Sequence, residues 1–268
     1  MKTNNLSVTI IGCGWLGMPL AQLLIEQKNT VFGSVRNSER IEELRLVGIE
    51  PFIIDLEKST EIPTEIAKST STLIITLPPI DRKNPARYAR ILEDLLRQFS
   101  DDTHVVFTSS TGIYPEETGN FEESFQFSSE QESTVLHRAE DAIRGSGKAH
   151  TIFRLGGLIG PKRHPIRFLQ GRRRLKNPKG SINFVHQGDC LSAIMQAIDD
   201  RQLIGTFNLV FPSHPSRESY YDDAAKHYGF QAPEFEANEK IDRIISSEKV
   251  QADFNFQFEF RIDCFPEL

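Results

Sequence analysis

The sequence Ile10-Ile11-Gly12-Cys13-Gly14-Trp15-Leu16-Gly17-Met18-Pro19 joins an apolar, β-branched run to an amphipathic one through the spacing G-x-G-x-x-G. Between a strand and a helix, the first glycine permits a tight turn, the second lets a pyrophosphate approach the backbone, and the third lets the helix pack on the strand. Free amide groups at the helix start would bind the phosphates. Glycines can also serve packing alone, but this context favours a dinucleotide site. The residues expected to contact the cofactor here are Gly12, Gly14, Trp15, Leu16 and Gly17.

Five further apolar runs follow at intervals, with helical patterns between them. Runs that are apolar throughout are typical of strands buried on both faces of a parallel sheet. The expected strands are residues 8–11, 30–32, 51–54, 72–76, 104–108 and 150–153. Strand–helix repetition predicts an α/β fold, a Rossmann-type doubly wound parallel sheet. We expect this domain to span residues 1–159, with residues 189–210 returning to it.

The pattern loosens from Gly160 onward, and residues 160–188 and 211–268 are predicted to form a smaller substrate-binding lobe. A helix is expected over 189–198 with Asp189 as its N-cap, then a strand over 206–210 and a helix over 219–228. Residues 254–262 alternate between apolar and polar side chains. This period of two predicts a strand that closes over the core, with a dimer-forming edge strand as the alternative.

Composition excludes several classes of protein. The 268 residues carry 31 Lys and Arg against 37 Asp and Glu, a net charge of −6, which argues against a general nucleic-acid binder. No apolar run approaches the roughly 18 residues of a membrane span. The three cysteines show no paired spacing and fit a reducing cytoplasm, and the histidines show no metal-ligand spacing. We therefore expect a cytoplasmic protein with no metal site.

The end of the second expected strand indicates which dinucleotide is bound. An NAD site usually has an acid about 20 residues past the glycines, to hold the ribose 2′-hydroxyl. Here the segment reads Gly33-Ser34-Val35-Arg36-Asn37-Ser38, with no acid before Glu39. A guanidinium group pairs with a 2′-phosphate through two charge-assisted hydrogen bonds. We therefore predict NADP rather than NAD, with Arg36 and Asn37 at the adenosine half, although Arg36 is also compatible with an ordinary solvated position.

With these residues placed, the chain resembles the extended and atypical branch of the short-chain dehydrogenase/reductase superfamily, the NAD-dependent epimerase/dehydratase group. The likeness rests on several segments in the family's order: 48–56, Ile75-Thr76-Leu77-Pro78-Pro79, Ser109-Ser110-Thr111-Gly112-Ile113-Tyr114-Pro115, 154–161 and 185–189. The resemblance implies further cofactor contacts from Asp55, Leu56, Leu77, Pro78, Ser109 and Gly156. It also implies a catalytic serine at Ser110, with Tyr114 at the same pocket.

One departure from the family concerns its proton donor, a tyrosine in Y-x-x-x-K. The matching positions are occupied by Glu132 and Leu136, and no tyrosine elsewhere in the chain has a lysine four residues later. A placed general acid or base contributes about 10²–10⁴ in rate. We name Ser110, Tyr114 and Glu132 as catalytic candidates, with Glu132 as a possible base.

A basic segment raises the question of the substrate. The stretches Pro161-Lys162-Arg163-His164-Pro165 and Gly171-Arg172-Arg173-Arg174-Leu175-Lys176 concentrate positive charge, and Arg163 and Arg172 are predicted phosphate contacts. A solvated loop explains the same charges. Two functions remain open. The first is an NADP(H)-dependent epimerase/dehydratase-like oxidoreductase acting on a small sugar-like or anionic substrate, as a monomer or homodimer. The second is a catalytically inactive NAD(P)-binding sensor or regulatory protein.

Overall fold

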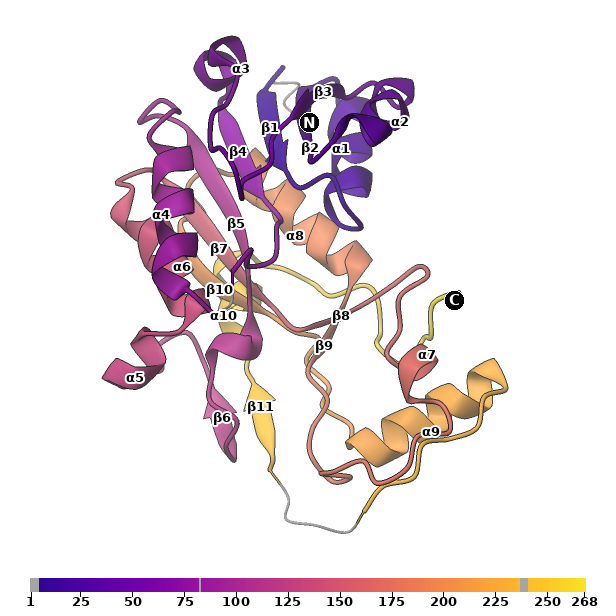
Figure 1. Ribbon diagram of the computed structural model, residues 1–268. Coiled ribbons are helices and arrows are strands. Elements are labelled where there is room, and N and C mark those ends of the chain that lie inside the picture. The colour runs from indigo at the N-terminus through magenta and orange to yellow at the C-terminus, as the bar shows by residue number, and fades with distance from the viewer. Residues whose placement is uncertain (1–4, 82, 237–240) are drawn as a thin grey trace. The chain divides into compact units, whose positions relative to one another are not determined.

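A seven-stranded sheet with strand order β10-β7-β5-β4-β1-β2-β3 forms the centre of the fold in the computed structural model, which describes residues 5–81, 83–236 and 241–268 (Figure 1). Its strands are β1 (Ser7–Ile11), β2 (Thr30–Val35), β3 (Glu50–Ile53), β4 (Thr72–Ile75), β5 (His104–Ser110), β7 (His150–Leu155) and β10 (Gly205–Leu209). β1 pairs in parallel with both β2 and β4, and the β2–β3 and β4–β5 pairs are also parallel. The predicted Rossmann-type sheet is therefore confirmed, and each predicted strand forms within three residues of its expected ends.

The order in which the chain adds strands to the sheet reverses between β1 and β4. The chain runs outward from β1 through β2 to β3 and then crosses back to β4 on the other side of β1. In doubly wound sheets the crevice at such a switch point, beyond the carboxyl ends of the strands, is where ligands bind. The glycine-rich segment follows β1 directly and so begins at this position.

The chain divides into two compact units. The first comprises residues 1–109, 127–153 and 193–206, and the second comprises residues 110–126, 154–192 and 207–268. Besides most of the sheet, the first unit holds the helices α1 (Gly17–Glu26), α2 (Ile41–Leu46), α3 (Thr64–Ser69), α4 (Pro85–Leu96), α5 (Ser129–Glu132) and α6 (Val135–Gly145), and the 3-10 turn η1 (Ser38–Arg40). The lobe boundaries expected from the sequence stay a prediction.

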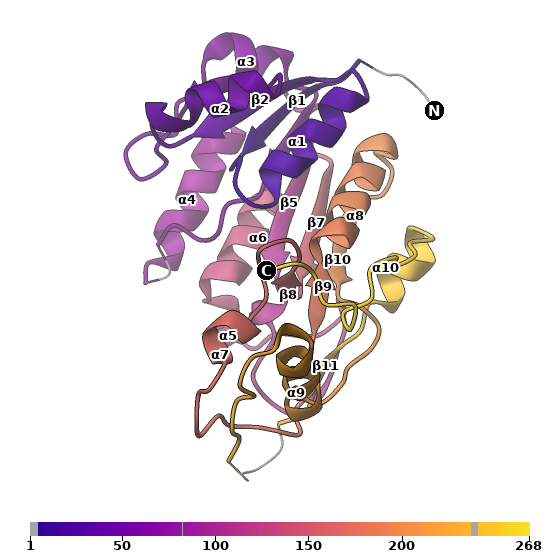
Figure 2. The ribbon, with the colours of Figure 1, turned by 90° about the vertical axis from the view of Figure 1, so that its right-hand side faces the viewer.

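Helices cover both faces of the sheet in the first unit. α4 and α6 lie side by side on one face, and α1 packs against β1 and β2 on the other (Figures 1 and 2). α4 begins where the Asn84 side chain accepts a hydrogen bond from the Arg87 amide (3.1 Å), and Pro85 occupies its first turn. The apolar side chains of α4 are buried in the core beneath it: Tyr88, Ile91, Leu92, Leu95 and Leu96.

The second unit contains two small parallel strand pairs, β6 (Gly119–Phe121) with β11 (Arg243–Ile245) and β8 (Gly157–Ile159) with β9 (Phe184–His186). Its other elements are the turn η2 (Thr111–Ile113) and the helices α7 (Ile166–Leu169), α9 (Arg217–Tyr228) and α10 (Glu248–Asp253). α8 (Gln187–Asp199) passes from this unit to the first. The core of the second unit includes Ile159, Ile166 and Ile182 together with the buried face of α9.

Two expectations for the second unit are wrong. In the described residues the tail 254–262 forms no strand; Phe254, Phe256 and Ile262 are buried as expected, whereas Phe260 is exposed. Asn255 interrupts the extended backbone with a φ of +47°. Asp189 is also not an N-cap, because α8 already begins at Gln187; its Oδ1 instead accepts hydrogen bonds from the tail amides of Glu259 (2.9 Å) and Phe260 (3.4 Å). Amides that bind this carboxylate are not available to a strand ladder.

Candidate cofactor site

The glycine-rich loop is held in a tight turn that its own glycines require. Gly12 has a φ of +110°, and the Gly14 amide donates a hydrogen bond to the Gly12 carbonyl oxygen (2.8 Å). A Cβ atom on Gly17 would lie 2.2 Å from that same oxygen, whereas a Cβ atom on Gly14 would meet nothing within 4 Å. Gly12 and Gly17 are therefore fixed by backbone conformation and close packing. Gly14 faces open space, as the close approach of a ligand requires.

Three side chains support this loop, and none of them was identified from the sequence. The Ser34 hydroxyl accepts from the Gly12 amide (2.9 Å), and the Thr76 hydroxyl donates to the Gly12 carbonyl (2.7 Å). Arg40 Nη1 donates to the Cys13 carbonyl (2.9 Å). Ser34 and Thr76 come from the ends of the strands on either side of β1, so strand order brings them to the loop.

The first turn of α1 has no side chain of its own that caps the helix or neutralises its positive end. Its N-cap residue, Leu16, offers no side-chain hydrogen bond, and the first turn has no acidic residue. α4 and α6, by contrast, begin with capping side chains from Asn84 and Thr134. The positive end of the α1 dipole is thus not neutralised by a side chain of its own first turn, which favours the binding of an anion there. Together with the open space at Gly14, this end of the helix fits the pyrophosphate of a dinucleotide.

A cavity of about 310 Å³ beside the loop brings together residues from the ends of β2, β3 and β4. It is lined by Ser34, Arg36, Ile54, Asp55, Leu56, Glu57, Leu77, Pro78, Pro79 and Ile80. Five of these are residues that the sequence assigned to the cofactor: Arg36, Asp55, Leu56, Leu77 and Pro78. Apolar side chains on two sides and charged groups at the rim suit a purine base and its ribose.

Charged groups at this rim are paired with one another. Arg36 Nε lies 3.4 Å from Asp55 Oδ1, and its Nη2 lies 2.9 Å from Glu57 Oε1. Lys58 also binds Asp55 (3.1 Å). The hydrogen bond from Lys58, with the Glu57 amide and the nearby Arg36 charge, holds the pKa of the Asp55 carboxyl below its usual value. Asp55 therefore stays ionised at the edge of the cavity.

The other predicted cofactor contacts of the first unit have local partners. Asn37 accepts from the Glu39 amide (3.2 Å) and so begins the turn η1. Leu16 is buried, and Trp15 is half-buried in the loop. Ser109 is buried, and its hydroxyl donates to Glu140 Oε1 (2.7 Å); Glu140 in turn forms a short ion pair with Arg144. Ser109 thus joins β5 to α6 through a buried carboxylate.

The three catalytic candidates, Ser110, Tyr114 and Glu132, differ in their burial and in the hydrogen bonds of their side chains. Ser110 is half-buried, and its Oγ accepts from the Gly112 amide (3.1 Å), which leaves its own proton to donate. Tyr114 is 2% exposed, its hydroxyl donates to Asn208 Oδ1 (2.9 Å) and accepts from Arg154 Nη1 (2.7 Å), and burial raises its pKa. Glu132 is exposed at the end of α5. Of the two hydroxyl groups, that of Ser110 has the proton that is free to move.

The remaining predicted site residues lie in the second unit: Gly156 as a cofactor contact, and Arg163 and Arg172 as substrate contacts. A Cβ atom on Gly156 would lie 2.7 Å from the Asn183 carbonyl oxygen, so this glycine serves close backbone packing. Arg163 is exposed, and its backbone pairs with Gly160. Arg172 is also exposed, next to Arg173 and Arg174, which form ion pairs with Glu234 (3.4 Å) and Glu236 (3.5 Å). The basic run is therefore partly neutralised by acids of its own unit.

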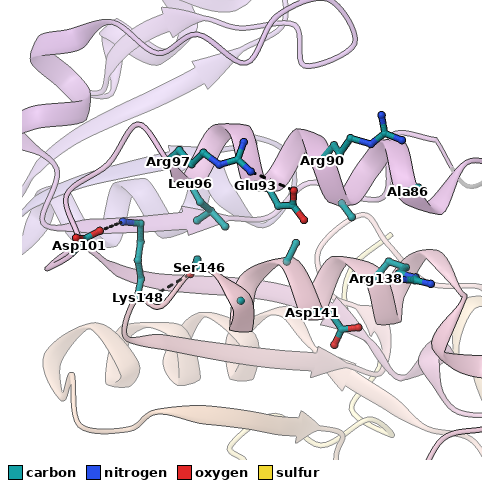
Figure 3. A pocket seen from close by; sticks show the side chains of 13 residues that line it. Ala86, Arg90, Glu93, Leu96, Arg97, Asp101, Arg138, Asp141, Ser146 and Lys148 are labelled. Carbon is teal, nitrogen blue, oxygen red and sulfur yellow. Dashed lines mark hydrogen bonds and ion pairs between the residues drawn. The ribbon is translucent and has the colours of Figure 1, made fainter. Parts of the chain in front are cut away.

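A larger cavity, of about 710 Å³, lies along the outer side of α4 and α6 and shares no lining residue with the cofactor cavity (Figure 3). Small side chains, among them Ala89, Ala142 and Gly145, line it together with charged ones. Arg90 and Glu93 extend from α4, and Arg138 and Asp141 extend from α6 (Figure 3). Its polar lining is better suited to binding the surface of another protein than to binding the base of a nucleotide.

Across 5–81, 83–236 and 241–268, no three His, Cys, Asp or Glu side chains gather as metal ligands would. In the same ranges no helix has the length and apolar character needed to cross a bilayer.

Comparison with known proteins agrees with this geometry. Residues 12–187 match the family model described as NAD(P)H-binding, so the chain belongs to this NAD(P)H-binding family. Protein YeeZ of Escherichia coli (strain K12) is 29% identical over 266 residues, covering 94% of this chain and 96% of that protein. The predicted dinucleotide-binding class is thereby confirmed.

Solved structures share the fold over nearly the whole chain. MoeE5 in complex with UDP-glucose and NAD aligns with a TM-score of 0.76 at 17% identity, covering 96% of this chain and 95% of MoeE5. UDP-glucuronic acid 4-epimerase from Bacillus cereus in complex with NAD also gives 0.76, at 14% identity, covering 96% and 94%. The epimerase/dehydratase-like fold expected from the sequence motifs is therefore confirmed.

Proposed function

We propose that this protein binds NADP(H) in preference to NAD(H) and acts as an epimerase/dehydratase-like oxidoreductase on a small sugar-like or anionic substrate. The observation that carries the proposal is the cavity in which Arg36 lies beside the open glycine-rich loop. When bound, the nicotinamide would supply or accept a hydride. The chain's own residues would orient the substrate and move a proton.

Arg36 is the residue proposed to select the phosphorylated cofactor. We expect Arg36→Gln to weaken NADP binding about tenfold to a hundredfold, because a hydrogen bond to a charged group contributes about 1.5–3 kcal/mol. NAD binding should change little, since a bare 2′-hydroxyl offers a guanidinium no comparable partner. Calorimetric titration of both cofactors into both proteins measures this. Tighter binding of NAD than of NADP to the unaltered protein would contradict the assignment.

Proton transfer is assigned to Ser110, with Tyr114 and Glu132 as the other candidates. Ser110 can donate a hydrogen bond to a substrate hydroxyl or carbonyl, since its Oγ already accepts from the Gly112 amide. Arg163 and Arg172 are proposed to hold an anionic group of the substrate. Nucleotide-sugar ligands in a protein of the same fold, MoeE5, favour a substrate of this size and charge.

A second candidate function is cofactor binding without turnover. It is favoured by Tyr114, whose hydroxyl is engaged by both Arg154 and Asn208, and by the absence of a Tyr-x-x-x-Lys pair in the sequence. Loading the protein with NADPH and following the absorbance of the reduced nicotinamide against sugars, aldehydes and quinones separates the two. Turnover that Ser110→Ala abolishes supports the enzyme. Silence across the panel with tight cofactor binding supports the sensor.

The face formed by α4 and α6 is proposed to bind a second copy of this chain. On each helix an arginine precedes an acid by three residues: Arg90 and Glu93 on α4, Arg138 and Asp141 on α6. A copy related by a two-fold axis runs antiparallel, so it can set each arginine opposite an acid. The small side chains between them allow close approach. A reducing cytoplasm is the proposed location of this assembly, and free Cys13, Cys190 and Cys264 support that proposal.

Charge reversal tests the dimer. We expect Arg138→Glu to raise the dimer dissociation constant at least tenfold, because like charges across an interface cost several kcal/mol. Arg45→Glu makes the same change of charge on α2 and should leave association unaltered. Sedimentation equilibrium measures both, and a monomeric unaltered protein at micromolar concentration would refute the proposal.

A further inference from the structure

Glu57 forms an ion pair with Arg36, whose guanidinium group is proposed to bind the 2′-phosphate of the cofactor. Its Oε1 lies 2.9 Å from Arg36 Nη2, and both side chains line the 310 Å³ cavity. A carboxylate and a phosphate present similar pairs of oxygens to a guanidinium fork. A 2′-phosphate that binds Arg36 must therefore either displace Glu57 or accept its negative charge as a neighbour.

We propose that Glu57 sets the preference between the two cofactors by competing with a 2′-phosphate for Arg36. This inference rests on the proposed binding of a pyridine dinucleotide in the cavity. With NADP, the carboxylate is an internal competitor that lowers affinity. With NAD, the same carboxylate is free to accept a hydrogen bond from the ribose 2′-hydroxyl, the role that an acid has in NAD sites. One ion pair thus opposes the first cofactor and assists the second.

The surroundings of the two acids single out Glu57 rather than Asp55. The Asp55 carboxylate also binds Lys58 (3.1 Å) and accepts from the Glu57 amide (3.2 Å), while its carbonyl accepts from the Lys58 and Ser59 amides. Its side chain is 16% exposed. Asp55 is thereby fixed at the base of a turn.

Glu57 lies at the outer part of that turn. Its side chain is 47% exposed, and Arg87 Nη2 donates to its backbone carbonyl (3.2 Å). The backbone is thus held while the carboxylate has room to leave Arg36. An exposed ion pair contributes only about 0.2–1 kcal/mol, so a cofactor phosphate can displace it.

The test is the ratio of NADP to NAD affinity in Glu57→Gln, measured by calorimetry and by the fluorescence of Trp15, the single tryptophan. We expect this ratio to rise about two- to fivefold, which is the strength of an exposed ion pair expressed as a fold-change. Glu42→Gln is the matched control. Glu42 pairs with Arg45 on α2 (2.6 Å) and does not line the cavity, but its substitution changes the net charge equally. We expect no change of ratio there.

Arg36→Gln provides the second arm. If Glu57 acts through Arg36, Glu57→Gln should have no effect on NADP affinity in an Arg36→Gln background. The inference is overturned if the ratio of NADP to NAD affinity in Glu57→Gln is unchanged, falls, or matches that in Glu42→Gln. This holds even where Arg36→Gln shows that the unaltered protein selects NADP. An unaltered protein that binds neither cofactor at millimolar concentration overturns the proposed function as well.

Discussion

Gly17→Ala should lower the free energy of unfolding by about 1–3 kcal/mol and abolish cofactor binding, because overpacking of a tight contact costs this much. The added methyl group would lie 2.2 Å from the Gly12 carbonyl oxygen, a backbone atom that can move only if the loop moves. That oxygen also accepts from the Gly14 amide and the Thr76 hydroxyl, so the turn has little freedom to adjust. Urea unfolding and calorimetric titration measure the two effects.

Gly14→Ala is the matched control within the same loop. Its methyl group would meet nothing within 4 Å, so stability should stay within about 0.5 kcal/mol of the unaltered protein. The same methyl group would occupy the space assigned to the pyrophosphate, and we expect cofactor affinity to fall at least tenfold. The assignment of the loop is wrong if Gly14→Ala binds the cofactor normally, or if Gly17→Ala is as stable as the unaltered protein.

Acid should destabilise the protein through His104. This side chain is 1% exposed, and burial, with Arg201 and His150 nearby, lowers its pKa to about 4. Thr151 Oγ1 donates to the Leu203 carbonyl, so the His104 Nε2 proton points to Thr151 (3.0 Å). In the unfolded chain His104 would titrate near 6.5, so only the unfolded state takes up a proton between pH 6.5 and 4. Stability from this group is complete above pH 6.5 and is lost as pH falls, by about 2 kcal/mol between pH 7 and 5.

The comparison with His104→Gln isolates this effect. Glutamine keeps an amide donor for Thr151 but does not titrate. Between pH 7 and 5, the free energy of unfolding of His104→Gln should therefore fall by about 2 kcal/mol less than that of the unaltered protein. Asp189, whose pKa burial raises to about 6, acts in the opposite direction in both proteins and cancels. Parallel pH profiles for the unaltered protein and His104→Gln would show that His104 is not the group responsible.

Those parts of the fold that depend on local pattern could be predicted from the sequence. Apolar runs such as 72–76 form strands because they are buried on both faces, and a glycine with a φ of +110° is required wherever the chain turns as it does at Gly12. The period of two in the tail correctly predicted that Phe254, Phe256 and Ile262 are buried, but Phe260 is 39% exposed. It did not predict a strand, because pairing depends on which groups the amides meet, and those of Glu259 and Phe260 meet Asp189.

The supports of the candidate site could not be predicted in the same way. Thr76 and Ser34 reach the loop because β4 and β2 lie on either side of β1, and Glu57 reaches Arg36 because β3 lies beside β2. These contacts follow from strand order and turn geometry rather than from spacing in the chain. In NAD sites the acid usually follows the second strand, whereas the acids that meet Arg36 follow the third. Sequence position therefore identified Arg36 at the edge of the cavity but did not identify Glu57 as its ion-pair partner.

The burial of Cys13 has a practical consequence for chemical labelling. Its thiol lies inside the glycine-rich loop, where burial raises its pKa to about 12, and burial also raises the pKa of Cys190. Thiol reagents attack the thiolate, so both side chains are protected at neutral pH. Cys264 is exposed. A maleimide dye should therefore modify the native protein at one position and leave the nucleotide loop chemically intact.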